Sequence, residues 1–169
     1  MSSDDTAFTE FVAETHGQLA RSARLLTGDW HTAEDLVQAT LMKVYRQWRR
    51  VVLADSALAY TQRIMLNLFL TSMRRRWHGE APSGELPERL GPDSDFTGAV
   101  GSRDALSRAL AGLPRRQRAV VVLRYYEDLS VEQTADLLDC SAATVRSQAS
   151  RALAKLRSDV GTARLELEA

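Results

Sequence analysis

The sequence predicts an all-α protein, made of two small helical domains joined by a flexible linker. Apolar residues recur at helical spacing in both halves, and neither strict alternation nor an Asn-Gly or Asp-Gly hairpin turn occurs. Between the halves, residues 79–101 contain five of the nine glycines and three of the four prolines, a composition typical of linkers. We therefore expect domains at 6–78 and 102–160, with the linker at 79–101 between them.

The N-terminal half carries start and stop signals for three helices. Gly28 is placed to end the first, and Thr32 and Ser56 are expected N-caps of the next two. We expect helices at 6–27, 33–49 and 57–77, and a loop at 51–56. One face of the second helix follows the spacing i, i+4, i+7, i+11 and should point to the core. It consists of Val37, Leu41, Val44 and Trp48.

The C-terminal half reads as four further helices with a short turn before the last. We expect these helices at 102–112, 114–127, 131–138 and 142–160, followed by a frayed tail. Ser130 and Gln133 form a capping box, and Ser141 is an expected N-cap. Asp139 stands in the turn, where aspartate tolerates left-handed backbone better than most residues. Two short helices around such a turn are typical of a helix-turn-helix.

The charge distribution supports a DNA-binding role for the last helix, although the formal net charge is zero. Residues 141–158 carry three arginines and one lysine without an acid, and the linker before them carries five acids and one base. In a major groove, Arg146 could read guanine, Gln148 adenine and Thr144 a thymine methyl group. Arg151 and Lys155 would hold phosphates. The candidate DNA-binding residues are Ser141, Thr144, Arg146, Ser147, Gln148, Arg151 and Lys155. The plainer interpretation is a helical hairpin with a solvated basic face.

Two polar faces distinguish the N-terminal half. One, on the second helix, mixes polar and apolar side chains as docking surfaces do. It comprises Asp35, Gln38, Met42 and Tyr45. The other, on the third helix, suits unpaired bases beside a phosphate track. It comprises Arg63, Asn67, Thr71, Arg74, Arg75 and Arg76. An ordinary half-exposed helix face explains the first equally well, and the dipole of a helix C-terminus would also favour the arginines.

The cysteine count and the apolar stretches of the sequence exclude several classes of protein. The single cysteine, Cys140, excludes an internal disulfide, and no stretch of eighteen apolar residues or signal peptide is present. These features predict a cytoplasmic protein without membrane insertion. His31, Glu34 and Asp35 give a weak metal-site pattern, with His16 as the sole further ligand candidate. We expect no catalytic residue, no metal and no cofactor.

Three segments resemble one known family over residues 6–160. They are GDWHTAEDLVQATLMKVYRQW at 28–48, AYTQRIMLNLFLTSMRRR at 59–76, and LAGLPRRQRAVVVLRYYEDLSVEQTADLLDCSAATVRSQASRALAKLR at 110–157. In this order they resemble regions 2.2, 2.3–2.4 and 4 of the extracytoplasmic-function (ECF) sigma factors, the group IV members of the sigma-70 family. The resemblance implies a subunit that binds core RNA polymerase and directs transcription from particular promoters.

The resemblance also implies a role for each candidate surface. The face of Asp35 and Gln38, with Met42 and Tyr45, would dock on the β′ clamp helices, and the C-terminal half on the β flap. Arg63, Asn67 and Thr71 would face the melted −10 element, with Arg74, Arg75 and Arg76 on nearby phosphates. The loop at 51–56 would help to hold a flipped base, the last helix would read the −35 duplex, and an anti-sigma factor is a further expected partner.

Five positions depart from the usual pattern of the family. They are Ala39 for an acidic residue, Tyr60 for tryptophan, Thr71 for Asp or Asn, Asp139 for the turn glycine and Gln148 for Arg or Lys. Because Thr71 and Gln148 lie on the two DNA-facing surfaces, the promoter sequence does not carry over from other members. The alternative function is a stand-alone helix-turn-helix regulator.

Overall fold

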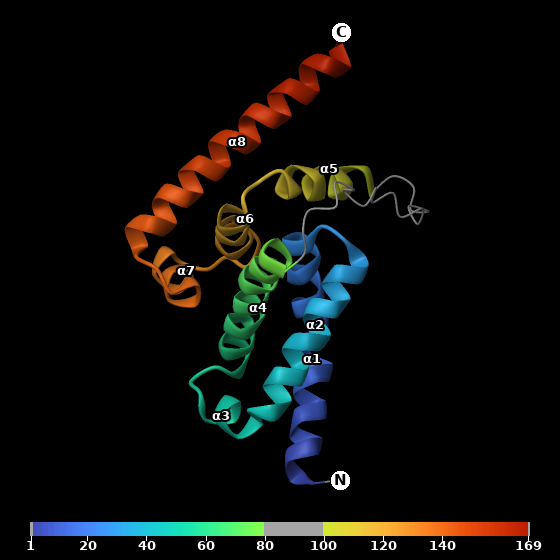
Figure 1. Ribbon diagram of the computed structural model, residues 1–169, viewed down its shortest axis with the longest axis vertical. Coiled ribbons are helices and arrows are strands. Elements are labelled where there is room, and N and C mark those ends of the chain that lie inside the picture. The colour runs from blue at the N-terminus through green and yellow to red at the C-terminus, as the bar shows by residue number, and fades with distance from the viewer. Residues whose placement is uncertain (1, 80–99, 169) are drawn as a thin grey trace.

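The computed structural model describes the backbone of residues 2–79 and 100–168, and the side chains of residues 2–71 and 105–161. All regular structure in these residues is helical, which confirms the predicted fold class. The first part contains α1 (Ser3–Thr27), α2 (Trp30–Arg46), α3 (Trp48–Leu53) and α4 (Ala57–Gly79). The second contains α5 (Val100–Ala111), α6 (Arg115–Val121), the π-helix η1 (Val122–Tyr126), α7 (Val131–Leu138) and α8 (Ala142–Glu168) (Figure 1). The predicted linker lies almost wholly outside the described residues.

Capping side chains set where α1 and α2 begin. Ser2 and Asp5 form a capping box, which starts α1 at Ser3 and not at the predicted residue 6. Gly28 ends this helix as predicted, with φ of 75°. The predicted cap of α2, Thr32, is wrong: Asp29 is the cap, and its carboxylate accepts from the amide (3.0 Å) and hydroxyl (2.6 Å) of Thr32. Aspartate is the stronger cap because it carries a full negative charge at the positive end of the helix.

The segment after α2 is more helical than the sequence predicts. The predicted helix at 33–49 breaks at Gln47, and α3 occupies half of the predicted loop at 51–56. Burial explains this helix, because Trp48 and Val51 turn inward and are 7% and 0% exposed. Phe8 packs edge-on against Trp48, with ring centroids 5.3 Å apart. Three residues of the predicted core stripe, Val37, Leu41 and Val44, pack inward from α2, whereas the fourth lies on α3. Ser56 caps α4 through the Ala59 amide, as predicted.

The helix predicted at 114–127 changes type midway. After α6 the backbone widens into η1, where the Glu127 amide donates to the Val122 carbonyl five residues back (2.9 Å). Val122 and Leu123 remain buried, whereas Tyr125 and Tyr126 are 55% and 44% exposed. A π-turn often marks a functional site. The predicted frayed tail is also wrong, because the backbone of α8 stays helical to Glu168.

The predicted helix-turn-helix is present. The capping box at Ser130 forms as expected, and Asp139 adopts the left-handed conformation that its place in the turn requires (φ 52°, ψ 53°). Ser141 accepts from the Thr144 amide and so caps α8. Ala135 and Leu138 of α7 pack in one cluster with Val145 of α8, which is 0% exposed.

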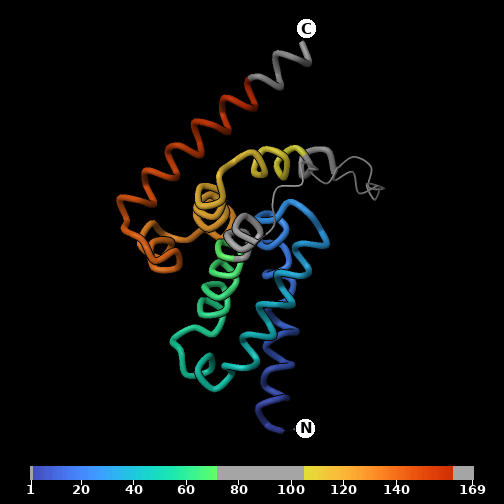
Figure 2. The backbone as a smooth tube through the Cα atoms, viewed as in Figure 1, coloured from blue at the N-terminus to red at the C-terminus, as the bar shows by residue number. Residues whose placement is uncertain are grey.

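The two halves pack against each other. A single apolar cluster contains Leu19 of α1, Leu66 of α4, Val120 of α6 and Leu123 of η1, all at most 3% exposed. Helix α4 also contacts α7, and α1 contacts α5 and η1. Figure 2 shows the C-terminal half lying across one end of the α1, α2 and α4 bundle. Each half thus completes the hydrophobic core of the other.

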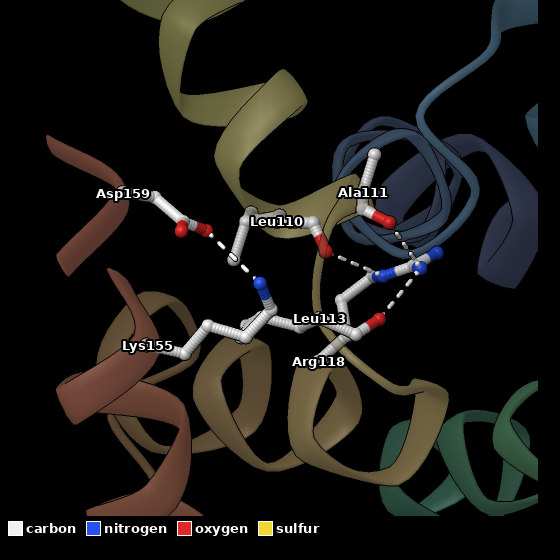
Figure 3. Close-up of polar contacts among 6 residues, drawn as sticks. All are labelled: Leu110, Ala111, Leu113, Arg118, Lys155 and Asp159. Carbon is white, nitrogen blue, oxygen red and sulfur yellow. Dashed lines mark hydrogen bonds and ion pairs between the residues drawn. The ribbon is translucent and has the colours of Figure 1, made fainter. Parts of the chain in front are cut away.

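Arg118 of α6 joins three chain segments through their carbonyl groups. Its guanidinium donates to Leu110 (2.8 Å), Ala111 (3.1 Å) and Leu113 (3.0 Å) around the end of α5 (Figure 3). A further bond, of 2.6 Å, reaches the Leu26 carbonyl in the last turn of α1. Burial lowers the pKa of Arg118 from its usual value, although an arginine keeps its charge. One cation therefore satisfies carbonyls that the helix ends leave without intrahelical partners.

Replacing Arg118 should destabilise the fold strongly. Arg118→Ala leaves partly buried carbonyls without donors, and we expect a loss of about 2–4 kcal/mol in the free energy of unfolding. Arg118→Lys should recover part of this loss, because an ammonium cannot reproduce the planar fork. Urea denaturation monitored by circular dichroism measures both, with Arg21→Ala on the exposed face of α1 as the control. Equal stability of Arg118→Ala and Arg21→Ala would contradict this role.

Candidate nucleic-acid interface

The buried face of α8 determines which of its side chains face outward. Val145, Ala149 and Ala152 point into the core and are 0%, 9% and 0% exposed. The opposite face therefore lies in solvent. Of the predicted DNA-binding residues, Ser141, Arg146, Ser147, Arg151 and Lys155 are exposed, and Thr144 and Gln148 are half-exposed. The structure thus brings the predicted set together along one accessible surface of the helix.

Some of these side chains already have intramolecular partners. The hydroxyls of Ser141 and Thr144 lie 2.9 Å apart at the helix cap, which leaves the threonine methyl for apolar contact. Arg146 faces Glu132 of α7 at 3.9 Å, and Lys155 pairs with Asp159 at 3.2 Å. Both ion pairs are solvent-accessible. Such pairs contribute about 0–1 kcal/mol, so a stronger anion can replace the carboxylate partner.

A shallow hollow beside α8 adds positive charge that the sequence reasoning did not assign to this surface. It has a volume of about 380 Å³ and lies between η1, the start of α7 and α8. Arg124 and Tyr125 line it from η1, and Arg146, Ser150 and Arg157 line it from α8. The guanidinium of Arg124 lies 5.7 Å from the ring centre of Tyr125. These η1 residues could not be assigned from the sequence, because a regular α-helix would place them differently.

The second candidate surface lies on α4. Arg63, Asn67 and Thr71 are exposed and follow one another at helical spacing, as predicted. Arg63 is not free, since its guanidinium donates to the Asp136 carbonyl of α7 at 2.8 Å. The side chains of Arg74, Arg75 and Arg76 lie outside the described residues. Just before α4, Val52 and Leu53 are 50% and 85% exposed, so the predicted base-holding loop presents apolar groups to solvent.

The third candidate surface lies on α2. Asp35, Gln38, Met42 and Tyr45 are all exposed on one face, and Met42 and Tyr45 remain 60% and 51% accessible. An exposed methionine beside an exposed aromatic ring is typical of a docking surface. The structure therefore keeps this predicted set together.

Tyr45 also anchors the first turn of α1. Its hydroxyl donates to the Asp5 carboxylate at 2.8 Å, and its ring lies 5.0 Å from that of Phe8. Hydrogen bonds from the Ser2 amide and the Tyr45 hydroxyl hold the pKa of Asp5 below its usual range. The same contact raises the pKa of Tyr45. About half of this tyrosine therefore stays accessible to a partner, while its hydroxyl is already hydrogen-bonded.

The weak metal-site pattern finds no support in the described part of the chain. There, no group of three or more His, Cys, Asp or Glu side chains lies close enough to bind a metal ion. His31 is exposed at the start of α2. None of the helices described is long and apolar enough to span a membrane.

Comparison with known proteins shows which family the two halves belong to. The family model described as Sigma-70 region 2 matches residues 11–79, and that described as Sigma-70, region 4 matches residues 103–156. The RNA polymerase sigma-E factor of Streptomyces coelicolor is 40% identical over 153 residues, which cover 90% of this chain and 85% of the relative. The ECF RNA polymerase sigma factor SigM of Mycobacterium tuberculosis is 32% identical over 154 residues, covering 90% of this chain and 76% of the relative.

Solved structures show the same arrangement of helices. A chain from the complex of the sigma factor RpoE with the anti-sigma factor NepR of Bartonella quintana superposes with a TM-score of 0.76 and 27% identity. The match covers 90% of this chain and 95% of that one. A chain from the complex of CnrH with the cytosolic domain of CnrY has a TM-score of 0.64 at 24% identity, covers 94% of this chain and 90% of that one, and shows the fold alone.

Proposed function

The chain belongs to the sigma-70 family of RNA polymerase sigma factors, in its ECF group, and we propose that it directs transcription by reading two promoter elements. In this proposal the C-terminal half reads the −35 element as duplex, and the N-terminal half reads the −10 element as melted single strand. The observation that carries it is the exposed face of α8, which has no acid between residues 141 and 158 and is supported by a correctly capped helix-turn-helix. A helix in this setting fits the major groove.

Region 4 would combine base readout with phosphate contacts. Arg146, Ser147 and Gln148 lie in the first two turns of α8, where a recognition helix meets base edges. Arg151 and Lys155 follow at the spacing of one helix face and would contact phosphates. Arg124 of the hollow would extend this phosphate track onto η1. Because Glu132 and Asp159 are exposed partners only, phosphates can displace them from Arg146 and Lys155.

Region 2 would hold polymerase on one face and DNA on another. The Asp35 and Gln38 face of α2 would dock on the β′ clamp helices, with Met42 as its apolar contact. The exposed face of α4, with Arg63 and Asn67, would meet unpaired bases. Val52 and Leu53 would supply apolar surface for a flipped base, since bases stack on apolar and aromatic groups.

The solved relatives suggest one more partner. One structure similar to this chain is that of the sigma factor RpoE bound to the anti-sigma factor NepR. We extend this to an anti-sigma protein that holds the present chain inactive, and we place the chain in the cytoplasm, where core polymerase and promoters are.

The experiment that tests the function mixes the purified protein with bacterial core RNA polymerase. Size-exclusion chromatography should show co-elution, and transcription from a genomic fragment library should then show new, discrete start sites. Tight binding of duplex DNA by the protein alone, without co-elution, would favour a stand-alone regulator instead.

The docking face is tested by the double variant Asp35→Ala with Gln38→Ala. We expect its affinity for core polymerase to fall roughly tenfold, because a combined loss of about 1.4 kcal/mol from the two side chains changes the Kd by that factor. Fluorescence anisotropy with labelled protein measures the affinity. The matched control is Glu10→Ala with Glu14→Ala, two exposed positions on α1. Unchanged affinity in the Asp35 and Gln38 variant would remove both residues from the docking face.

The −35 readout is tested by Arg146→Ala. A bidentate contact with a base contributes about 1–3 kcal/mol, so transcription from a −35-dependent promoter should fall roughly 5- to 150-fold. Arg151→Ala should instead weaken all promoters to a similar degree, as loss of a phosphate contact does. Run-off transcription from promoters with intact and altered −35 elements separates the two variants. Full activity of Arg146→Ala on every promoter would show that Arg146 does not read the −35 element.

A further inference from the structure

A dense group of cations lies where α2 ends and α3 begins, outside the surfaces assigned above. Residues 43–50, KVYRQWRR, contain four cations and no acid. All four side chains are exposed: Lys43 and Arg46 in α2, and Arg49 and Arg50 in α3. We refer to Arg46, Arg49 and Arg50 as the corner arginines. The proposed function gives them no role.

The neighbours of the corner arginines are anchored to the rest of the N-terminal half. Trp48 and Val51 are 7% and 0% exposed, so one side of α3 is held against the core. Arg49 and Arg50, which lie between them in the sequence, are left on the solvent side. The Tyr60 hydroxyl of α4 donates to the Gln47 side chain at 3.2 Å. The corner is therefore fixed in place while its cations face solvent.

A hollow of about 500 Å³ separates the corner arginines from the first turn of α1. Asp4 and Asp5 line its other side. Asp4 lies 3.5 Å from Arg49, in a pair whose side chains are 58% and 91% exposed. Asp5 is bonded instead to the Ser2 amide and the Tyr45 hydroxyl. Because exposed ion pairs contribute little, a stronger anion can displace Asp4 from Arg49.

The chemistry of this corner suits a chain of phosphates with bases attached. A guanidinium group binds two phosphate oxygens through parallel hydrogen bonds, and three of these groups lie within five residues. Apolar groups follow directly, since Val52 and Leu53 are 50% and 85% exposed. Proteins bind single strands by combining a cationic track for the backbone with surfaces that contact bases. The corner therefore fits a single-stranded nucleic acid.

The place of the corner in the fold indicates which part of a strand would reach it. In the proposed function, the −10 bases meet α4 and the loop at 51–56, and the duplex on one side leads to the −35 element. Figure 1 shows α3 at the end of the α1, α2 and α4 bundle remote from α5 and α6. A strand that passes the loop and continues away from the −35 element therefore runs over this corner.

We propose that the corner arginines bind phosphates of the melted strand beyond the −10 element, towards the transcription start, and that Asp4 competes with these phosphates for Arg49. This inference rests on the proposed function. Lys43, one turn before Arg46 on α2, extends the cationic track. The contact with single-stranded DNA thus continues past the bases that α4 reads.

The strand contact is tested with the complete complex of this protein and core polymerase. Two forked promoters share their duplex and −10 bases, but their non-template strand ends either directly after the −10 element or ten nucleotides further on. Fluorescence anisotropy at several salt concentrations measures the affinity for each. For Arg49→Gln with Arg50→Gln, the salt slope on the long fork should fall by about 1.4, because each single-strand phosphate contact contributes about 0.7. That change corresponds to a roughly 25-fold weaker complex at 0.1 M salt, relative to 1 M.

The short fork and a charge-matched variant serve as controls. Arg49→Gln with Arg50→Gln should bind the short fork as the parent does. Arg21→Gln with Arg24→Gln removes two cations from α1 and should leave the difference between the forks unchanged. Equal weakening on both forks would overturn the inference in favour of a contact with polymerase, and an unchanged long-fork affinity would overturn it outright. Failure of the parent complex to bind either fork would overturn the proposed function itself.

The competing carboxylate gives a test of opposite sign. Asp4→Asn should strengthen binding of the long fork by up to about fivefold, because Arg49 loses its intramolecular partner. This gain should disappear when Asp4→Asn is combined with Arg49→Gln, since the two residues act through one interaction. A gain that persists without Arg49, or one that is equal on the short fork, would show that Asp4 does not compete with the strand.

Discussion

The structure depends on one apolar boundary, where α6 and η1 lie against α1 and α4. Neither half is large enough to bury all of its apolar residues alone, and small domains bury a lower fraction of their surface than large ones. The two halves bury their apolar residues together, in a single cluster that contains Leu19, Leu66, Val120 and Leu123. The position of every candidate binding surface follows, because each lies on a helix whose opposite side is buried in that cluster or beside it.

Polar groups at this boundary determine how the halves are aligned. Apolar packing is not directional, whereas the bonds from Arg118 to the end of α1 and from three side chains to Glu127 each require one orientation. The arginine acts mainly on carbonyls at helix ends, which need donors in any arrangement. The glutamate acts instead on side chains of α1 and α4.

This division of roles links stability to function. Ala135, Leu138 and Val145 of the helix-turn-helix pack in the same cluster as Leu19 of α1 and Leu66 of α4, so the boundary between the halves also supports this motif. The exposed face of α8 points away from that cluster into solvent. The face of α4 is different, since Arg63 is occupied by α7 when the halves touch. Of the candidate surfaces on α4 and α8, the one on α4 is therefore the one that the contact between the halves partly occupies.

The sequence by itself determined the local features: helix periodicity, the end at Gly28, the capping box at Ser130, the left-handed Asp139 and the spacing of the three candidate faces. Each of these features depends on residues within about four positions of one another along the chain, so it can be recognised from the sequence without knowledge of the fold. Tertiary structure decided the rest. Burial of Trp48 and Val51 made α3 a helix, and packing widened η1. Only the folded chain brings Glu127 to Gln18, which lies 109 positions away, because long-range contacts depend on how whole faces fit together.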